Sequence, residues 1–266
     1  MKKFGIVLAL TLVMIVSCAC VFSPIKLDYN DGVYHVVLDG KYFAKKINFV
    51  ASENLISNEE AHKKYKSKLT MNTGFFDPNN QKTISYIVEK SNDIVADPML
   101  NENLLDNSVL RQNLDKVLNR TEFRIVECDS KYHYEIVPHK TPVDFACTIE
   151  TSAQGGPQIL PELRMKEEFF VVKDEQGNVK RESISALHRC ARTIIGLKDG
   201  DVHLLIFTNL HPLTLPEVKT YCENLGLERA MGFDGGSSTS FIYKNINVTS
   251  TKSLAGRKLK SFMIIK

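Results

Sequence analysis

The sequence predicts a single α+β domain, built from many-stranded mixed sheets with a few packed helices. Short apolar runs alternate with turn-forming residues along most of the chain, whereas only two helix starts carry a full capping signature. Hydrophobic residues make up 43% of the 266 residues and charged residues 24%, which is typical of a globular protein with a sizeable core. We find no internal repeat and no long linker, so one domain is expected.

The N-terminus predicts an exported protein. Lys2 and Lys3 precede an almost wholly apolar run over 6–16, and small residues follow, as in a secretory signal peptide. The run is too short for an ordinary membrane span.

The end of this run resembles the bacterial lipobox. Residues 15–18 read Ile-Val-Ser-Cys, and in a lipobox the Cys is lipidated and becomes the new N-terminus. A plain signal cut near Cys20 or Ser23 is the alternative. We expect lipid attachment at Cys18, which would place the protein at the bacterial cell envelope on a membrane anchor. The expected boundaries are a signal over 1–17, a linker over 18–30 and the domain over 31–266.

Charge and cysteine usage exclude several classes of partner. Loss of 1–17 removes two lysines and no acid, so the formal net charge falls from +3 to +1 and no nucleic-acid partner is expected. The remaining cysteines show no CxxC spacing, which argues against zinc; an exported protein could pair them, but spacing does not give the pairing. No cofactor or metal is expected, although acids near a phosphate often share a divalent cation.

The first half of the chain predicts one strand and two helical regions. Residues 32–38 are typical of a strand that ends in a turn at 39–40. A capping box over 57–60 predicts a helix that ends near Lys68. Leucines spaced through 98–119 predict further helix. Residues 80–145 match no motif and could be an insertion.

The second half alternates strands with turns. A second capping box, from Thr214 to Glu217, predicts a helix that ends near Leu225. Asp234 follows directly on the last strand of this series. The expected strands are 123–128, 132–137, 145–149, 169–172, 193–197, 202–207 and 229–233.

Four stretches combine glycine or turn residues with polar side chains at strand ends. They are NTGFFD (72–77), AQGGPQIL (153–160), ARTIIGLKDGDVHLLIF (191–207) and TLPEVKTYCENLGLERAMGFDGGSS (214–238). Each has a structural explanation: glycines mark bulges or hairpin turns, Arg192 could form a surface ion pair, and Thr214 with Glu217 caps a helix. Only their combination indicates a site.

In order and spacing, these stretches resemble the phosphodiester glycosidase family over about 69–266. That family typically shows Asn-Gly-Gly-Phe-Phe, Gly-Gly-Pro, Pro-Arg-Thr-Ala-Ile-Gly, Gly-Leu-Thr-x-x-Glu and Asp-Gly-Gly-Gly-Ser-Ser. This chain departs from the pattern at Thr73, at Ala191, at His211 with Pro212, and in having two glycines after Asp234. None of these changes removes a polar residue that the resemblance assigns to the site.

The resemblance implies hydrolysis of a sugar-1-phosphodiester in a cell-surface glycan or glycoconjugate. Glycoside cleavage commonly uses two carboxylates, for which Asp234 and Glu217 are the candidates. Arg192 would clamp the phosphate through its planar, always charged fork. Asn72 completes the implied catalytic set. The implied substrate-binding residues are Thr193, Thr214, Gly235, Gly236, Ser237, Ser238, Gly155 and Gly156.

Two other functions remain open from the sequence. The departures at Thr73 and His211 are compatible with a surface lipoprotein that binds a carbohydrate or sugar phosphate without turning it over. A structural envelope protein would bind neither. Convergence of Asn72, Arg192, Glu217 and Asp234 on one region would favour a site over the structural role.

Overall fold

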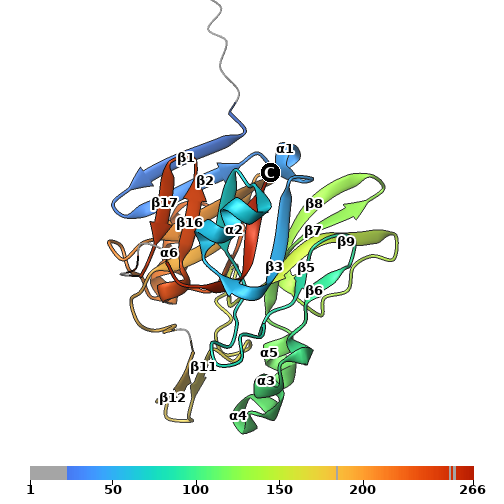
Figure 1. Cartoon of the computed structure of the whole chain (residues 1–266). Helices are drawn as coiled ribbons and strands as arrows, with labels where there is room; N and C mark the ends of the chain where they lie inside the picture. Colours follow the sequence, from blue (N-terminus) through green and yellow to red (C-terminus); the bar gives the residue numbers. More distant parts are fainter. Residues whose placement is uncertain (1–22, 184, 252, 254–255) are drawn as a thin grey trace, which may run out of the picture.

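The computed structural model describes residues 23–183, 185–251, 253 and 256–266, so the predicted signal and Cys18 lie outside the described residues. Three sheets carry the fold (Figure 1). The α+β class is confirmed. All described strand pairings are antiparallel, so the sheets are not mixed in strand direction. Within the described residues no helix is long and apolar enough to cross a membrane.

The first sheet has six strands and carries the motif residues Arg192 and Thr193. Its spatial order is β1 (Ile25–Asn30), β2 (Val33–Leu38), β14 (Asp201–Phe207), β13 (Arg192–Lys198), β15 (Arg229–Gly232) and β10 (Gln158–Leu160). β1 pairs with β2 along its whole length, so residues 25–30 of the segment expected as a linker over 18–30 form a sheet strand.

The second sheet brings the C-terminal strand beside the first motif. Its order is β17 (Ile246–Thr249), β16 (Ser240–Tyr243), β4 (Leu69–Asn72), β18 (Leu259–Ile265) and β3 (Ile47–Ile56). Asn72 ends β4, and Phe262 of β18 pairs with it. Segments nearly 200 residues apart in sequence are therefore neighbours here.

The third sheet is built largely from the segment that could have been an insertion. Its order is β6 (Ile94–Ala96), β5 (Ile87–Val88), β9 (Cys147–Gln154), β7 (Thr121–Cys128) and β8 (Lys131–Pro138). Phe123 and Ile125 of β7 belong to the same buried cluster as Met71 and Met263 of the second sheet. This segment therefore shares the main core of the domain. A disulfide joins Cys128 to Cys147, which lie opposite each other on β7 and β9.

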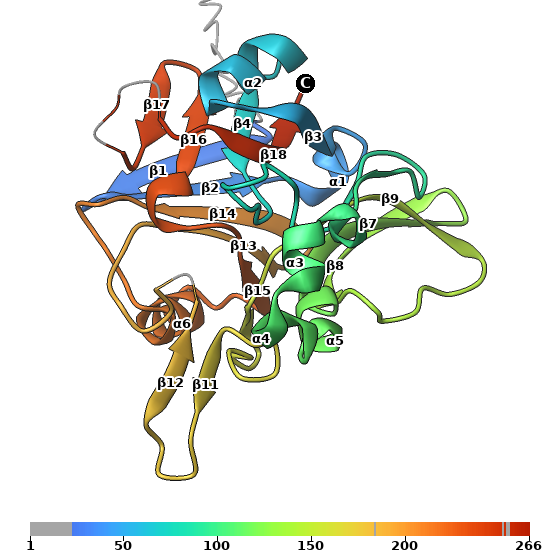
Figure 2. The same cartoon turned by 60° about the horizontal axis from the view of Figure 1, so that its bottom comes forward.

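Both predicted capping boxes are confirmed. Ser57 caps α2 (Asn58–Tyr65) and Thr214 caps α6 (Leu215–Asn224), each with the reciprocal Glu bond to the cap backbone. α6 packs its apolar face, Leu215, Val218 and Cys222, on the first sheet (Figure 2). The predicted turn at 39–40 instead starts the one-turn helix α1 (Gly40–Phe43), because the Asp39 carboxylate accepts from the Tyr42 amide at 2.8 Å.

The helix expected over 98–119 is broken into short pieces. They are the 3₁₀ turn η1 (Pro98–Leu100), α3 (Glu102–Asp106), α4 (Ser108–Arg111) and α5 (Leu114–Leu118). Asn101 and Asn107 cap α3 and α4 with their side chains, and such caps start a new helix instead of continuing the previous one. The strand expected over 169–172 is found in part as β11 (Val171–Lys173), which forms a hairpin with β12 (Val179–Glu182) that projects from the body in Figure 2.

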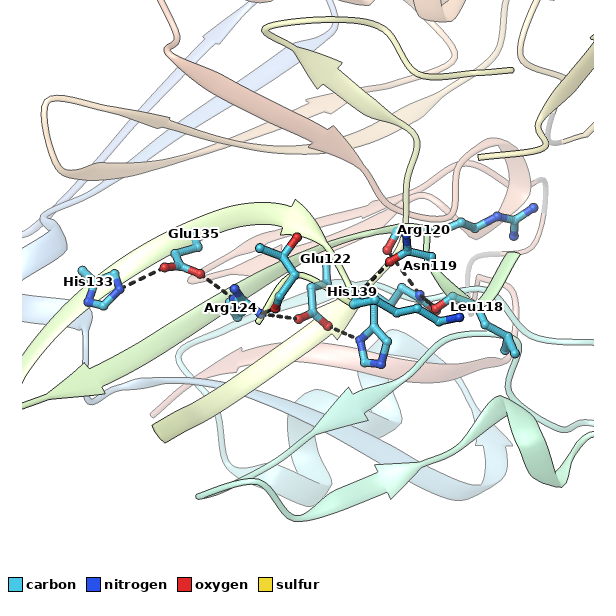
Figure 3. A network of polar contacts seen from close by, with 11 residues as sticks. Leu118, Asn119, Arg120, Glu122, Arg124, His133, Glu135 and His139 are labelled. Carbon is cyan, nitrogen blue, oxygen red and sulfur yellow. Dashed lines mark hydrogen bonds and ion pairs between the residues drawn. The ribbon is translucent and has the colours of Figure 1, made fainter. Parts of the chain in front are cut away.

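A buried ionic network crosses the face of β7 and β8 (Figure 3). The Arg124 side chain is 2% exposed and donates to Glu122, to Glu135 and to the Thr141 carbonyl. Glu122 also lies 2.8 Å from Nδ1 of His139. The network therefore satisfies a buried charge pair that would otherwise be costly.

Candidate functional site

Asn72 holds the centre of the candidate site together. Its Nδ2 donates to the Asp234 carbonyl at 2.6 Å, and its Oδ1 accepts from Oγ1 of Thr193 at 2.9 Å and from the Ser240 amide at 3.0 Å. Asn72 and Thr193 are each 1% exposed. Side chains buried in this way are positioning groups, because their polar atoms already bond within the protein.

Asp234 lies two residues beyond β15, where the chain leaves the first sheet. Its amide donates to the Thr73 carbonyl at 2.8 Å, which fixes the backbone beside the first motif. The side chain is only partly exposed, and protein atoms crowd the carboxyl group. Burial raises the pKa of Asp234 to about 6. The Ser238 hydroxyl, the Arg257 charge and the Gly235 amide favour the ionised form and partly offset this rise. A carboxyl group with this pKa can exchange protons near neutral pH.

Arg192 lies near Gly235, the residue after Asp234, and bonds within the protein. It is 2% exposed. Its Nε donates to the Leu213 carbonyl at 2.8 Å, and its Nη2 donates to the carbonyls of Ser185 and His188 at 2.7 and 2.8 Å. These bonds pin the loop before β13 and the segment before α6 to the sheet. Arg192 therefore shapes the site through its backbone contacts.

The glycines after Asp234 allow the loop to pack against β13. A Cβ on Gly235 would lie 3.0 Å from the Ala191 carbonyl oxygen, and Gly236 has a φ of +58° in the short 3₁₀ turn η2 (Gly236–Ser238). The Gly236 amide donates to that same carbonyl at 2.8 Å, and the Gly235 amide bonds the Asp234 carboxylate. The amides of two implied substrate-binding residues, Gly235 and Gly236, are thus already engaged.

Thr214 and Glu217 form the start of α6. Oε2 of Glu217 accepts from the amide and hydroxyl of Thr214, both at 2.9 Å, and Oε1 pairs with Arg189. The backbone and hydroxyl bonds from Thr214, together with Arg189, lower the pKa of Glu217. Arg192 reaches the segment before α6 through the Leu213 carbonyl. Within the described residues the side-chain hydrogen bonds of Glu217 go to Thr214 and Arg189 alone.

Gly155 and Gly156 lie behind the Asp234 strand. The Gly156 amide donates to the Gly232 carbonyl at 2.8 Å, and a Cβ on Gly155 would lie 2.6 Å from that oxygen. A Cβ on Gly156 would meet the buried carboxylate of Glu168 at 2.3 Å. Close packing against β15 therefore explains the glycine at 155, and the Glu168 carboxylate explains the glycine at 156.

Arg257 is a residue of this region that the sequence analysis missed. Its Nη1 donates to the hydroxyls of Ser237 at 3.0 Å and Ser238 at 3.3 Å, and its guanidinium lies 5.0 Å from the Phe76 ring centroid. A single Arg in a polar loop carries no sequence signal. It reaches the site because β18, which follows it, pairs with β4 beside Asn72.

The main cavities of the molecule do not coincide with the candidate site. Two cavities, of about 650 and 550 Å³, are lined by none of the predicted site residues. The site is therefore defined by the side-chain contacts of its residues and not by a cavity. In the described part of the chain, no group of three or more His, Cys, Asp or Glu side chains is arranged to hold a metal ion.

The sequence profile of the phosphodiester glycosidase family matches residues 65–266, which is most of the chain and includes every motif above. The chain belongs to the phosphodiester glycosidase family. No curated protein sequence matches it.

Solved structures agree with the fold of this phosphodiester glycosidase family member. The zebrafish N-acetylglucosamine-1-phosphodiester α-N-acetylglucosaminidase catalytic domain, auto-inhibited by its pro-peptide, is similar with a TM-score of 0.63 and 13% identity; the match covers 91% of this chain and 81% of that one. A hypothetical protein from Synechocystis is similar with a TM-score of 0.59 and 12% identity, covering 91% and 61%. At such identities the likeness concerns the fold.

Proposed function

We propose that this protein is an exported hydrolase that cleaves the glycosidic bond of a sugar-1-phosphodiester in a cell-surface glycan or glycoconjugate. The observation that carries this proposal is the Asp234 carboxyl group. Its pKa of about 6 and its place beside Ser238 and Arg257 combine a proton-transfer group with a cation in one corner of the fold. Membership of the phosphodiester glycosidase family supports the reaction class.

The reaction needs a base and a cation more than a strong acid. Water forms a bond to the anomeric carbon, and the bond from that carbon to the bridging phosphate oxygen breaks. The electron pair leaves with a phosphomonoester, whose second pKa is about 6, so it departs as an anion. Asp234 as carboxylate accepts the proton of the attacking water. Glu217, which is held ionised by Thr214 and Arg189, is the proposed second carboxylate and stabilises positive charge on the sugar.

Turnover on defined substrates tests the proposal. The protein would be incubated with sugar-1-phosphodiesters of N-acetylglucosamine, glucose and galactose, and the released phosphomonoester would be measured. We expect release from at least one, and loss of that release in Asp234→Asn. Binding without release by the native protein would favour the sugar-phosphate-binding function. If the native protein shows no binding and no release, a structural envelope protein is favoured.

We also propose lipid attachment at Cys18, on the sequence of residues 15–18. Two or more acyl chains are needed for stable anchoring, which a bacterial lipoprotein modification supplies. Cys18→Ala should move the protein from the membrane fraction to the soluble fraction, and Cys20→Ala is the matched control that should leave it anchored. A Cys18→Ala protein that stays in the membrane with its signal cleaved would exclude this anchor.

A further inference from the structure

The cation expected to bind phosphate, Arg192, is occupied. Its Nε and Nη2 donate to three backbone carbonyls, and its side chain is almost fully buried. Its position is therefore fixed by the loops that it holds. To grip a phosphate, Nε and Nη2 would have to release carbonyls, each of which would then lose a charge-assisted hydrogen bond.

Backbone amides offer little to replace it. The amides of Gly235 and Gly236 are engaged by the Asp234 carboxylate and the Ala191 carbonyl. A substrate phosphate beside Asp234 needs a side-chain donor that is charged and accessible. Without one, the negative charges of phosphate and carboxylate would repel each other at close range.

Arg257 meets these needs. Its side chain is partly exposed, and its guanidinium is held over the Phe76 ring, which restricts the plane of the fork. Within the described residues its hydrogen bonds run from Nη1 alone, to Ser237 and Ser238, so Nε and Nη2 keep donors for a ligand. Its charge already acts on the Asp234 carboxylate.

We propose that Arg257 is the residue that binds the substrate phosphate, with the Ser237 and Ser238 hydroxyls as neighbouring donors, while Arg192 is a positioning residue. This assignment rests on the proposed function of the same site. It makes the C-terminal segment before β18 part of the phosphate-binding surface. A guanidinium fork suits the paired oxygens of a phosphate, and a Lys at this place would supply only a point charge.

Binding of inorganic phosphate tests Arg257 independently of turnover. The dissociation constant would be measured by calorimetry at pH 7 and fixed ionic strength for the native protein, Arg257→Gln, Arg257→Lys and Lys258→Gln. Lys258→Gln is the matched control, because it removes the same charge from an exposed neighbour. We expect Arg257→Gln to weaken binding about tenfold to a hundredfold, Arg257→Lys to weaken it less, and Lys258→Gln to change it by less than about twofold.

The outcomes separate this proposal from the proposed function. Loss of phosphate binding in Arg257→Gln supports the assignment even if no phosphodiester is hydrolysed. Equal binding by the native protein and Arg257→Gln overturns it, and so does the absence of phosphate binding by the native protein. Where turnover is found, Arg257→Lys should raise KM more than it lowers kcat, which a merely structural role would not produce. Thermal unfolding checks each variant, and Arg257→Lys decides if Arg257→Gln does not fold.

Discussion

At the scale of single residues, the same packing that orders the Asp234 loop also sets its chemistry. Gly235 lets the loop approach the Ala191 carbonyl, and Asn72 binds the Asp234 carbonyl from the second sheet. The carboxyl group is thereby drawn away from water, which disfavours its ionised form. A turn former at this place would need no such enclosure, so the environment of Asp234 favours a chemical role.

Asp234→Asn should change stability with pH and also remove activity. The folded pKa of about 6 lies above the ordinary value of 3.8, so the stability contributed by the protonated carboxyl is fully present below about pH 4 and lost as pH rises through 6. The Asn variant keeps its neutral side chain, so above pH 6 it should be more stable by up to about 3 kcal/mol. Below pH 4 the two proteins should be equal.

Urea unfolding at pH 4, 6 and 8 measures this difference, and turnover is followed on the same preparations. Turnover should fall at least about a hundredfold, as expected when a general acid–base group is lost. Stability curves that stay parallel from pH 4 to 8 would show that the Asp234 pKa is ordinary. Full activity of Asp234→Asn would show that Asp234 is only a turn-forming residue with no catalytic role.

At the scale of elements, the start of α6 joins a helix cap to the candidate site. Thr214 and Glu217 satisfy each other in the capping box, and Glu217 also holds Arg189. The Glu217 side chain therefore has two roles, as a helix cap and as a proposed catalytic group. They can be separated, because Gln also serves at the third position of a capping box.

Glu217→Gln should keep the helix but lower turnover, since the amide retains the cap bond and loses the charge. Thr214→Ala should instead lower the free energy of unfolding by about 1 kcal/mol, the usual loss for a helix N-cap. Circular dichroism, urea unfolding and initial rates on both variants measure the two effects. If Glu217→Gln turns over as fast as the native protein, Glu217 is only a cap residue.

At the scale of the whole molecule, residues of all three sheets meet in one core. Phe123 of the third sheet, Ile195 of the first and Met263 of the second belong to one buried cluster. The segment 80–145 is therefore expected to unfold together with the rest of the domain, although it carries no family motif.

Arg124→Met should lower the stability of the entire domain in a single transition. It leaves Glu122 buried with His139 as its remaining hydrogen-bond partner, and a broken buried pair costs roughly 3–5 kcal/mol, with the lower end expected here. Lys63→Met is the matched control, because the Lys63–Glu59 pair is exposed and should matter little. Calorimetry would contradict the shared core if Arg124→Met split unfolding into two separate transitions.

Local signals in the sequence were enough for many of the secondary-structure elements. Both capping boxes, the β7–β8 and β11–β12 hairpins and the order of the motifs depend on residues a few positions apart. Such signals act through the backbone of their own segment, so they can be read without knowing the fold. The helix expected over 98–119 is present only as short pieces, because asparagine caps compete with helix periodicity inside the same stretch.

The sequence by itself thus determined the fold class, the family resemblance and the prominence of Asp234. Only the tertiary structure decided what surrounds that carboxyl group. The bond from Asn72 to Asp234 spans 162 residues, and the contacts of Arg257 with Ser237 and Ser238 depend on β18 returning beside β4. The burial and the raised pKa of Asp234 arise from such distant contacts, whereas the carbonyls that engage Arg192 lie 4 to 21 residues away in sequence. Their energies depend on how segments pack in space, and no short stretch of sequence carries that information.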